Sequence, residues 1–394
     1  MMRPLLVRFA LLGCAVHALS AHTLNAQTRI VRIESRILGE IRTLHVSVPA
    51  NYRLARQRYQ VTYLLDGHVK PFFDLAVAAS GYSLSGDVRD YAMPAQIIVG
   101  IEQKDRSNDL NRGDEKFTRF LVDEVIPYID REYRTVPFRT LIGHSLGGRF
   151  ALLTLCRAPT VFPAVIAISP SIADSSTFDT VQRCMRQQFT QTPSRVRQLV
   201  LSVGEKEARL RPATQRLAAF TRDSAPHNWR VYQVDGAGLG HTETPFTTIP
   251  LGMRFVQDRA VWEIALTAAD SVVNRLGDPT TILAAALSPV SERVGFPVPP
   301  SLKWLEVTAR TRFARDGAEA AVKAAQAIVD AFPESLVGYG LLADAYLKRL
   351  EPALARKAIA DALQLLERLE LFDEGAREQQ RDALRSSLAA LGRR

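Results

Sequence analysis

The segment Gly143–Gly148, which reads Gly-His-Ser-Leu-Gly-Gly, constrains the fold of this chain more than any other. It matches the pattern G-x-S-x-G, follows a β-like apolar run at 140–142 and opens a helix-like run at 149–153. Glycines two positions before and after the serine remove side chains that would clash in a sharp turn. The motif therefore predicts a strand, a strained turn and a helix, with the Ser145 hydroxyl clear of the sheet at the helix N-terminus.

Strand-like and helix-like patterns alternate across residues 28–257. That order predicts an α/β fold: a mostly parallel sheet covered by helices on both faces, with chemistry at the carboxyl ends of the strands. An antiparallel hairpin at a sheet edge is expected first, and Pro127 is expected to kink the helix that carries it. The expected strands are 29–38, 41–48, 61–65, 95–101, 165–168, 198–203 and 230–234, and the expected helices include 115–133 and 212–222.

The chain divides at a proline-rich boundary, Pro297–Pro300. We expect a catalytic α/β-hydrolase domain over 27–257, a connecting segment over 258–300 and a helical domain over 301–394. A weak repeat with a spacing of 34 residues, in which Ala324 shifts onto Ala358, suits a tetratricopeptide-like helical domain. Such a domain can dock a protein partner or a second copy of the chain, but a plain helical appendage fits the pattern as well.

The N-terminus is typical of a secretory signal peptide over residues 1–26, with arginines before an apolar run and cleavage after Ser20 or Ala26. We therefore expect a periplasmic or secreted protein. The run is too short to span a bilayer stably, and no later stretch is long and apolar enough. Cys156 and Cys184 remain after cleavage, either as one disulfide or as two small buried side chains.

The composition is that of a globular protein, with 394 residues of which 47% are hydrophobic and 23% charged. The net charge of +9 is spread along the chain instead of being gathered in runs, which argues against nucleic-acid binding. The spacing of cysteines and histidines suggests no metal site, and we expect no cofactor.

A serine at such a turn needs a base to accept its proton and an acid to orient that base. In an α/β-hydrolase the chain order is serine, acid, histidine, and only His227 and His241 follow Ser145. His241 follows the last expected strand in a glycine-rich loop, whereas His227 precedes that strand, at the wrong end. The sequence therefore favours His241 as the base and a surface position for His227.

The acid is expected after the strand at 198–203, where Glu205 and Glu207 both occur. Glu207 is favoured because the third residue past the glycine of such a loop usually turns inward. Glu205 is the alternative acid. A third interpretation is that a glutamate here only forms an ion pair with Lys206. Asp235 also lies nearby, at the start of the histidine loop.

An oxyanion hole requires two N–H donors. The first is the N–H of Leu146, which directly follows the serine, and the second is that of Gly67 or His68, in the loop after the strand at 61–65. His68 can instead line the pocket or point to solvent. His144 neighbours the serine, but adjacent side chains on a tight turn point apart, so we interpret it as a packing residue.

These features together resemble the bacterial putative-esterase family of α/β-hydrolases, and most of all its siderophore-esterase-like branch. The family includes S-formylglutathione hydrolases, feruloyl esterases and mycolyltransferases. By this resemblance, which covers residues 28–257, Ser145 is the nucleophile, His241 the base and Glu207 the acid, while Arg106 and Asp109 fix a loop at the pocket rim. Relatives often carry tryptophans where this chain has 172–175. The matching segments are 63–67, 98–101, 105–106, 109–110, 117–121, 126–129, 133–135, 143–148, 168–171, 202–204 and residue 207.

The leading hypothesis is an exported serine esterase that cleaves a small-molecule carboxylic ester through an acyl-enzyme. An acyltransferase with the same residues is the second hypothesis, and product analysis with added alcohols distinguishes the two. A hydrolase-like scaffold that binds a partner through its helical tail is the third, and it predicts that Ser145 does not react with covalent probes.

Overall fold

The computed structural model describes residues 27–50, 52–81, 95–111, 115–191, 195–262, 264, 275, 279–369 and 374–392. The predicted signal peptide, residues 1–26, lies outside the described residues.

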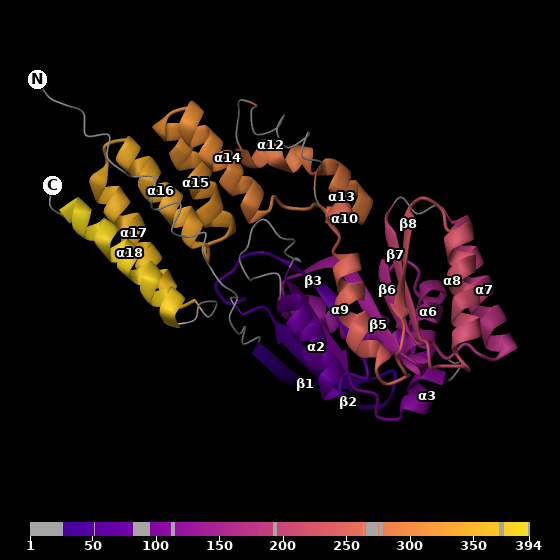
Figure 1. Cartoon of the computed structure of the whole chain (residues 1–394). Coiled ribbons are helices and arrows are strands. Elements are labelled where there is room, and N and C mark those ends of the chain that lie inside the picture. The colour runs from indigo at the N-terminus through magenta and orange to yellow at the C-terminus, as the bar shows by residue number, and fades with distance from the viewer. Residues whose placement is uncertain are drawn as a thin grey trace, which may run out of the picture.

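The centre of the molecule is an eight-stranded sheet with the order β1-β2-β4-β3-β5-β6-β7-β8 (Figure 1). The first two strands form the antiparallel hairpin expected at the edge, β2 pairs antiparallel with β4, and the remaining neighbours are parallel. The mostly parallel sheet predicted from the alternating pattern is thus confirmed. The strands are β1 (Gln27–Ser35), β2 (Glu40–Val48), β3 (Tyr59–Leu65), β4 (Gln96–Ile101), β5 (Thr135–His144), β6 (Ala164–Ile168), β7 (Arg197–Gly204) and β8 (Trp229–Gly236).

Helices cover both faces of the sheet, as expected for the α/β-hydrolase fold (Figure 1). On one face α2 packs against α9, and on the other α6 packs against β5, β6 and α7. The helices of this part are α2 (Lys70–Gly81), α3 (Arg106–Asn111), α4 (Lys116–Arg119), α5 (Ile126–Glu132), α6 (Leu146–Arg157), α7 (Ser175–Thr190), α8 (Arg211–Ser224) and α9 (Thr244–Val256).

The helix expected to kink at Pro127 is irregular at that point. A π-helical segment, Phe120–Val125, joins α4 to α5, and Pro127 sits in the first turn of α5. A proline has no N–H to donate to the preceding turn, so the regular hydrogen-bond ladder breaks where it stands.

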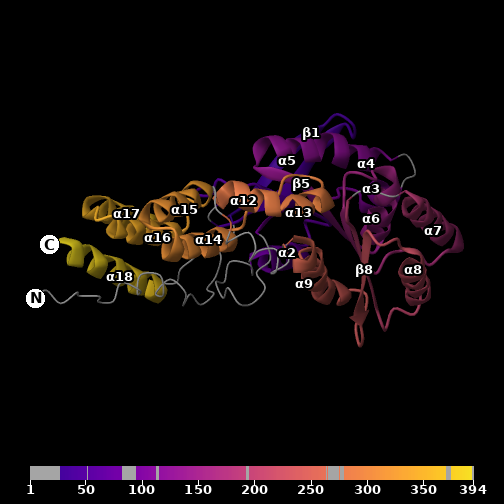
Figure 2. The ribbon, with the colours of Figure 1, turned by 90° about the horizontal axis from the view of Figure 1, so that it is seen from above.

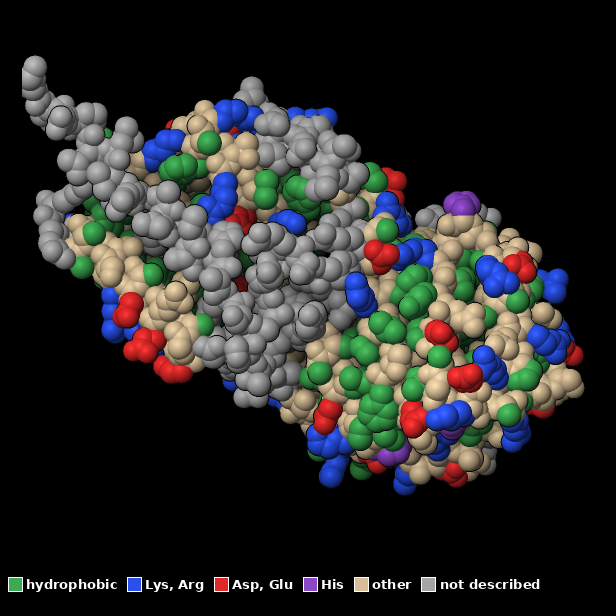
Figure 3. All heavy atoms as spheres, viewed as in Figure 1, with side chains coloured by type: hydrophobic (Ala, Val, Ile, Leu, Met, Phe, Trp, Pro, Cys, Tyr) green, Lys and Arg blue, Asp and Glu red, His purple; other side chains and the backbone are tan. Residues whose placement is uncertain are grey.

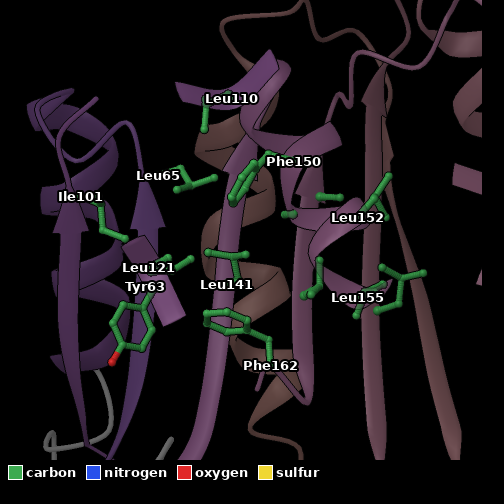
Figure 4. Close-up of a cluster of buried hydrophobic side chains, with 14 of the residues drawn as sticks. Tyr63, Leu65, Ile101, Leu110, Leu121, Leu141, Phe150, Leu152, Leu155 and Phe162 are labelled. Carbon is green, nitrogen blue, oxygen red and sulfur yellow. The ribbon is translucent and has the colours of Figure 1, made fainter. Parts of the chain in front are cut away.

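Side chains of the central strands alternate between two cores. Leu141 belongs to the cluster under α6 and α7, whereas its neighbour Ile142 belongs to the cluster under α2 and α9. This follows from the two-residue period of a strand, whose successive side chains point to opposite faces. Figure 4 shows the first cluster, in which Phe150 and Leu152 of α6 lie over the strands that carry Leu65 and Leu141. The sheet is therefore buried on both faces, and this packing fixes the positions of its strand ends.

A disulfide joins Cys156 of α6 to Cys184 of α7. Of the two arrangements that the sequence left open, the structure has the bonded one. The bond ties the helix behind Gly143–Gly148 to the helix that follows the loop after β6.

A helical region follows the sheet and lies beside it, so that the molecule is elongated (Figure 2). Each of the helices α14 to α18 packs against the next one along the chain, and Leu54 of the α/β part contacts their shared core. The expected C-terminal helical region is therefore present, while its likeness to tetratricopeptide repeats stays a prediction. The helices are α10 (Arg259–Trp262), α12 (Pro279–Ala286), α13 (Ser288–Val294), α14 (Leu302–Arg315), α15 (Ala318–Ala331), α16 (Leu336–Lys348), α17 (Pro352–Leu366) and α18 (Glu374–Gly392).

Basic and acidic side chains are interspersed over the face shown in Figure 3, without a continuous basic patch. Among the described helices, none is long and apolar enough to cross a membrane.

Candidate active site

Ser145 lies in the turn between β5 and α6 and has a backbone conformation that non-glycine residues rarely adopt, with φ 60° and ψ −115°. The turn is tight because two glycines meet in it. A Cβ on Gly143 would lie 2.1 Å from the carbonyl oxygen of Gly147. Such strain persists only where the surroundings enforce it, and it is characteristic of nucleophile turns. The predicted strand, turn and helix are therefore all present.

The Ser145 side chain opens into a cavity of about 590 Å³. Its Oγ lies 3.2 Å from Oγ of Ser171, which follows β6. Leu146 is the first residue of α6, so its N–H has no partner inside the helix and points with the helix dipole toward the serine. This end of α6 can stabilise a negative charge beside Ser145.

His241 and Glu207 lie together at the edge of the same cavity. Nδ1 of His241 is 2.6 Å from Oε2 of Glu207, although 34 residues separate the two along the chain. His241 follows β8 and Glu207 follows β7, and because these strands are parallel neighbours their ends bring the two loops together. The contact fixes the orientation of the imidazole ring and leaves its other nitrogen for chemistry.

Glu207 is buried and fully engaged. Its Oε1 accepts hydrogen bonds from the hydroxyl of Ser169 (2.6 Å), the N–H of Gly204 (2.6 Å) and the hydroxyl of Thr244 (3.1 Å). Burial raises the pKa of the carboxyl, but the hydrogen bonds from these groups and from His241 outweigh it, so the net pKa is lowered. The side chain is therefore held as a carboxylate at neutral pH.

The other two acids considered from the sequence have different roles. Glu205 is exposed and accepts a hydrogen bond from the N–H of Gly238 (2.7 Å). Asp235 accepts one from the N–H of Ala237 (3.1 Å). Both brace the loop that carries His241, whereas Glu207 is the acid that contacts the imidazole of His241 within the described residues.

His144 packs under the site, as expected, and also contacts His241. Its Nε2 lies 2.9 Å from the backbone carbonyl oxygen of His241, and the two rings have centroids 4.4 Å apart. A carbonyl oxygen only accepts, so Nε2 of His144 carries the hydrogen and donates it. Burial and the neighbouring His241 lower the pKa of His144 to about 4, which keeps this ring neutral. No local pattern could reveal this contact, because His241 is 97 residues away from His144 along the chain.

The two candidates for the second oxyanion donor differ. The N–H of Gly67 donates to the carbonyl oxygen of Ile101 at 2.9 Å, so it is not available to an oxyanion, and this candidate was wrong. The sequence could not reveal this bond because it depends on the neighbouring strand β4. His68 follows in the same loop and its side chain is exposed. Neither residue is among those that line the 590 Å³ cavity.

Arg106 and Asp109 hold loops at the rim, in agreement with the resemblance. Arg106 makes two hydrogen bonds to the buried Asp66 (2.6 and 2.9 Å) and a third to the carbonyl oxygen of His144 (2.9 Å). Asp109 pairs with Arg42 through two hydrogen bonds of 2.5 and 2.7 Å. The two ion pairs connect α3 to β2 and to the loop after β3, and the bond to His144 connects it to the end of β5, next to Ser145.

Several residues of the site were not singled out from the sequence. Ser169 and Thr244 hold Glu207, and their only sequence signal was their position just after a strand or within the histidine loop. Arg149, Lys206 and Arg209 line the cavity; Lys206 was considered from the sequence only as an ion-pair partner of a glutamate, and nothing marked the two arginines. Among the described residues, no group of three or more histidines, cysteines or acids is placed to hold a metal ion.

Comparison with known proteins gives a family and a fold. The family model described as "Putative esterase" matches residues 35–271, more than half of the chain. The chain is 33% identical over 147 residues to the uncharacterized protein YjcH of Bacillus subtilis strain 168, which covers 35% of this chain and 59% of that protein. It is 41% identical over 86 residues to the ferri-bacillibactin esterase BesA of the same organism, which covers 21% of this chain and 30% of BesA. The chain thus spans less than two thirds of each of these curated relatives.

Among solved structures, an IroE-like serine hydrolase from Shewanella oneidensis superposes with a TM-score of 0.60 and 20% sequence identity. The match covers 77% of this chain and 99% of that one. At this identity the likeness establishes the α/β-hydrolase fold.

Proposed function

Because the chain belongs to the putative esterase family, a family of carboxylic ester hydrolases, we propose that it is a serine hydrolase that cleaves a carboxylic ester through an acyl-enzyme. One observation carries this proposal: the 2.6 Å contact between His241 and the buried Glu207 lies at the cavity into which the strained Ser145 opens. A nucleophile, a base and an orienting carboxylate at one cavity are the parts that acyl transfer requires.

In the first half of the reaction, Ser145 Oγ attacks the acyl carbon of the ester and Nε2 of His241 accepts its proton. The carbonyl oxygen becomes an oxyanion, which the N–H of Leu146 and, we propose, the N–H of His68 stabilise. His241 then protonates the alcohol oxygen as the bond between the acyl carbon and that oxygen breaks. The alcohol leaves, and the acyl group stays on Ser145.

In the second half, water attacks the acyl-enzyme while His241 accepts its proton, and the proton then returns to Ser145 Oγ as the acid is released. Glu207 accepts the hydrogen bond from Nδ1–H of His241 throughout. This bond selects the tautomer with a free Nε2 and stabilises the imidazolium that forms in each half. Three further hydrogen bonds to its Oε1 keep the carboxylate in place.

The role of Glu207 is tested by a matched pair of variants. We expect Glu207→Gln to lower kcat for a 4-nitrophenyl ester by about 10²–10⁴-fold, as loss of an orienting acid does in serine proteases. Glu205→Gln removes an exposed carboxylate two positions away and should keep kcat within about twofold. Equal losses in the two variants would show that Glu207 has no special part in the reaction.

We also propose that the protein is exported. The predicted signal peptide supports this, and so does the disulfide between Cys156 and Cys184, because such bonds persist in oxidising compartments. The N-terminal sequence of protein recovered from the periplasm or medium of an expressing bacterium tests it. Cleavage after Ser20 or Ala26 is expected, and an intact Met1 on protein confined to the cytoplasm would contradict it.

A further inference from the structure

We infer that the ester cleaved at this site carries a carboxylate near its scissile bond, and that Arg149, Lys206 and Arg209 bind this group. The inference rests on the proposed function, since it assigns a substrate class to the same cavity. Its starting point is the lining of the cavity, in which all three cations take part.

The cations come from two separate elements beside the reacting groups. Arg149 lies on α6 four residues after Ser145, about one helical turn, so it faces the same side of the helix as the serine. Lys206 and Arg209 lie between β7 and α8, on either side of Glu207. A substrate positioned at Ser145 is therefore within the field of all three charges.

No ion pair within the described residues uses up these charges. Arg149 donates to the side-chain oxygen of Asn111, a neutral group, and the side chains of Lys206 and Arg209 are exposed. Burial lowers the pKa of Arg149 by more than the charge of Asp174 raises it, which indicates that the charge of Arg149 is compensated only in part.

Two acids, Asp174 and Glu207, line the same cavity, against three cations. Glu207 is engaged by His241, as described above. Asp174 is exposed and caps the N-terminus of α7, where it accepts a hydrogen bond from the N–H of Thr177 (2.8 Å). The cavity therefore keeps a positive excess that a carboxylate on the substrate would match.

The cavity recognises its substrate mainly through polar and charged groups. None of the described residues that line the cavity is Phe, Tyr or Trp, and residues 172–175 include none either. Stacking of aromatic rings therefore contributes little to binding, and charge-assisted hydrogen bonds are the main source of selectivity.

The test compares esters that differ by one negative charge. One pair is the 4-nitrophenyl half-ester of glutaric acid and its methyl ester, which places the carboxylate on the acyl side. The other pair is 4-acetoxybenzoate and its methyl ester, which places it on the alcohol side. We expect kcat/KM to be at least about tenfold higher for the charged member of one pair at low ionic strength, and this preference to fall as salt is added.

Variants of the three cations test which of them causes the preference for the charged ester. Arg149→Gln should reduce the preference about tenfold or more, because its guanidinium is partly buried. Lys206→Gln and Arg209→Gln should reduce it a few-fold each, because exposed charges are screened. Arg183→Gln removes an exposed cation of α7 outside the cavity and serves as the matched control, with both esters hydrolysed as by the wild type.

The results of these assays distinguish failure of the inference from failure of the proposed function. No preference for charge in either pair, or a preference that survives Arg149→Gln and the two other variants, would overturn the inference while leaving esterase activity intact. Absence of turnover with all four esters would contradict the proposed function itself, and the inference with it.

Discussion

Acidification should destabilise this protein through His144, whose ring packs under the site. The ring is largely buried, its Nε2 donates to the carbonyl oxygen of His241, and it lies against the ring of Phe72. Burial, followed by the charge of His241, lowers its pKa to about 4. The other charged groups that face it are Asp66, which raises the pKa, and Arg106, which lowers it. Protonation of His144 is therefore costly in the folded state.

Proton linkage gives the sign and the size of the change in the free energy of unfolding with pH. In the unfolded chain a histidine has a pKa of about 6.5, so between about pH 6.5 and pH 4 the unfolded state binds the proton more tightly. The stability associated with neutral His144 is complete above pH 6.5 and is lost as the pH falls through its folded pKa. At ~1.4 kcal/mol per pH unit the full loss is about 3 kcal/mol, of which about 2.5 kcal/mol falls between pH 7 and pH 4.5.

Urea unfolding of the wild type and of His144→Gln at pH 7.0, 5.5 and 4.5 measures this contribution. Glutamine keeps an N–H donor for the carbonyl of His241 but does not titrate. The free energy of unfolding of the wild type should fall by about 2.5 kcal/mol more than that of the variant over this range. His227→Gln, which removes an exposed imidazole, is the control. If the free energies of unfolding of the wild type and of His144→Gln fall in parallel with pH, His144 does not cause the loss of stability.

Two further predictions concern the frame of the site. Gly143→Ala places a Cβ 2.1 Å from the carbonyl oxygen of Gly147, a backbone atom that cannot move aside. We therefore expect urea unfolding to show a free energy of unfolding lower by ~1–3 kcal/mol or more, together with loss of esterase activity. Gly340→Ala in α16 meets nothing within 4 Å and should instead add about 0.5–1 kcal/mol, and a similar response of both variants would contradict the close approach. Reduction of the Cys156–Cys184 bond, which closes a loop of 28 residues, should lower the free energy of unfolding by about 3–4 kcal/mol. An unchanged urea midpoint after reduction, verified by intact mass, would show that the bond contributes nothing to stability.

Local patterns were enough to predict the sheet and the turn at Ser145. Strands such as β3 and β7 are short apolar runs buried on both faces, and the glycines around Ser145 mark a turn that few other residues permit. The pairing of His241 with Glu207 could be anticipated because both follow neighbouring parallel strands. Those parts of the site depend on residues close in sequence and on strand order.

The rest depends on contacts between distant parts of the chain. The N–H of Gly67 is taken by Ile101 of a neighbouring strand, which no local pattern reveals. The bond from His144 to His241 spans 97 residues. The cluster of Arg149, Lys206 and Arg209 likewise forms only when α6 and the loop after β7 are brought together around one cavity, because these residues are far apart along the chain.

In the proposed mechanism Ser145 is a nucleophile that His241 activates. Reaction of the purified protein with a fluorophosphonate probe, read by intact mass and peptide mapping, tests it most directly, with Ser145→Ala and His241→Ala beside it. We expect one adduct on Ser145 in the wild type, none in Ser145→Ala, and labelling slowed by about 10³-fold or more in His241→Ala. A folded wild-type protein that stays unlabelled, or labels as fast without His241, would contradict it.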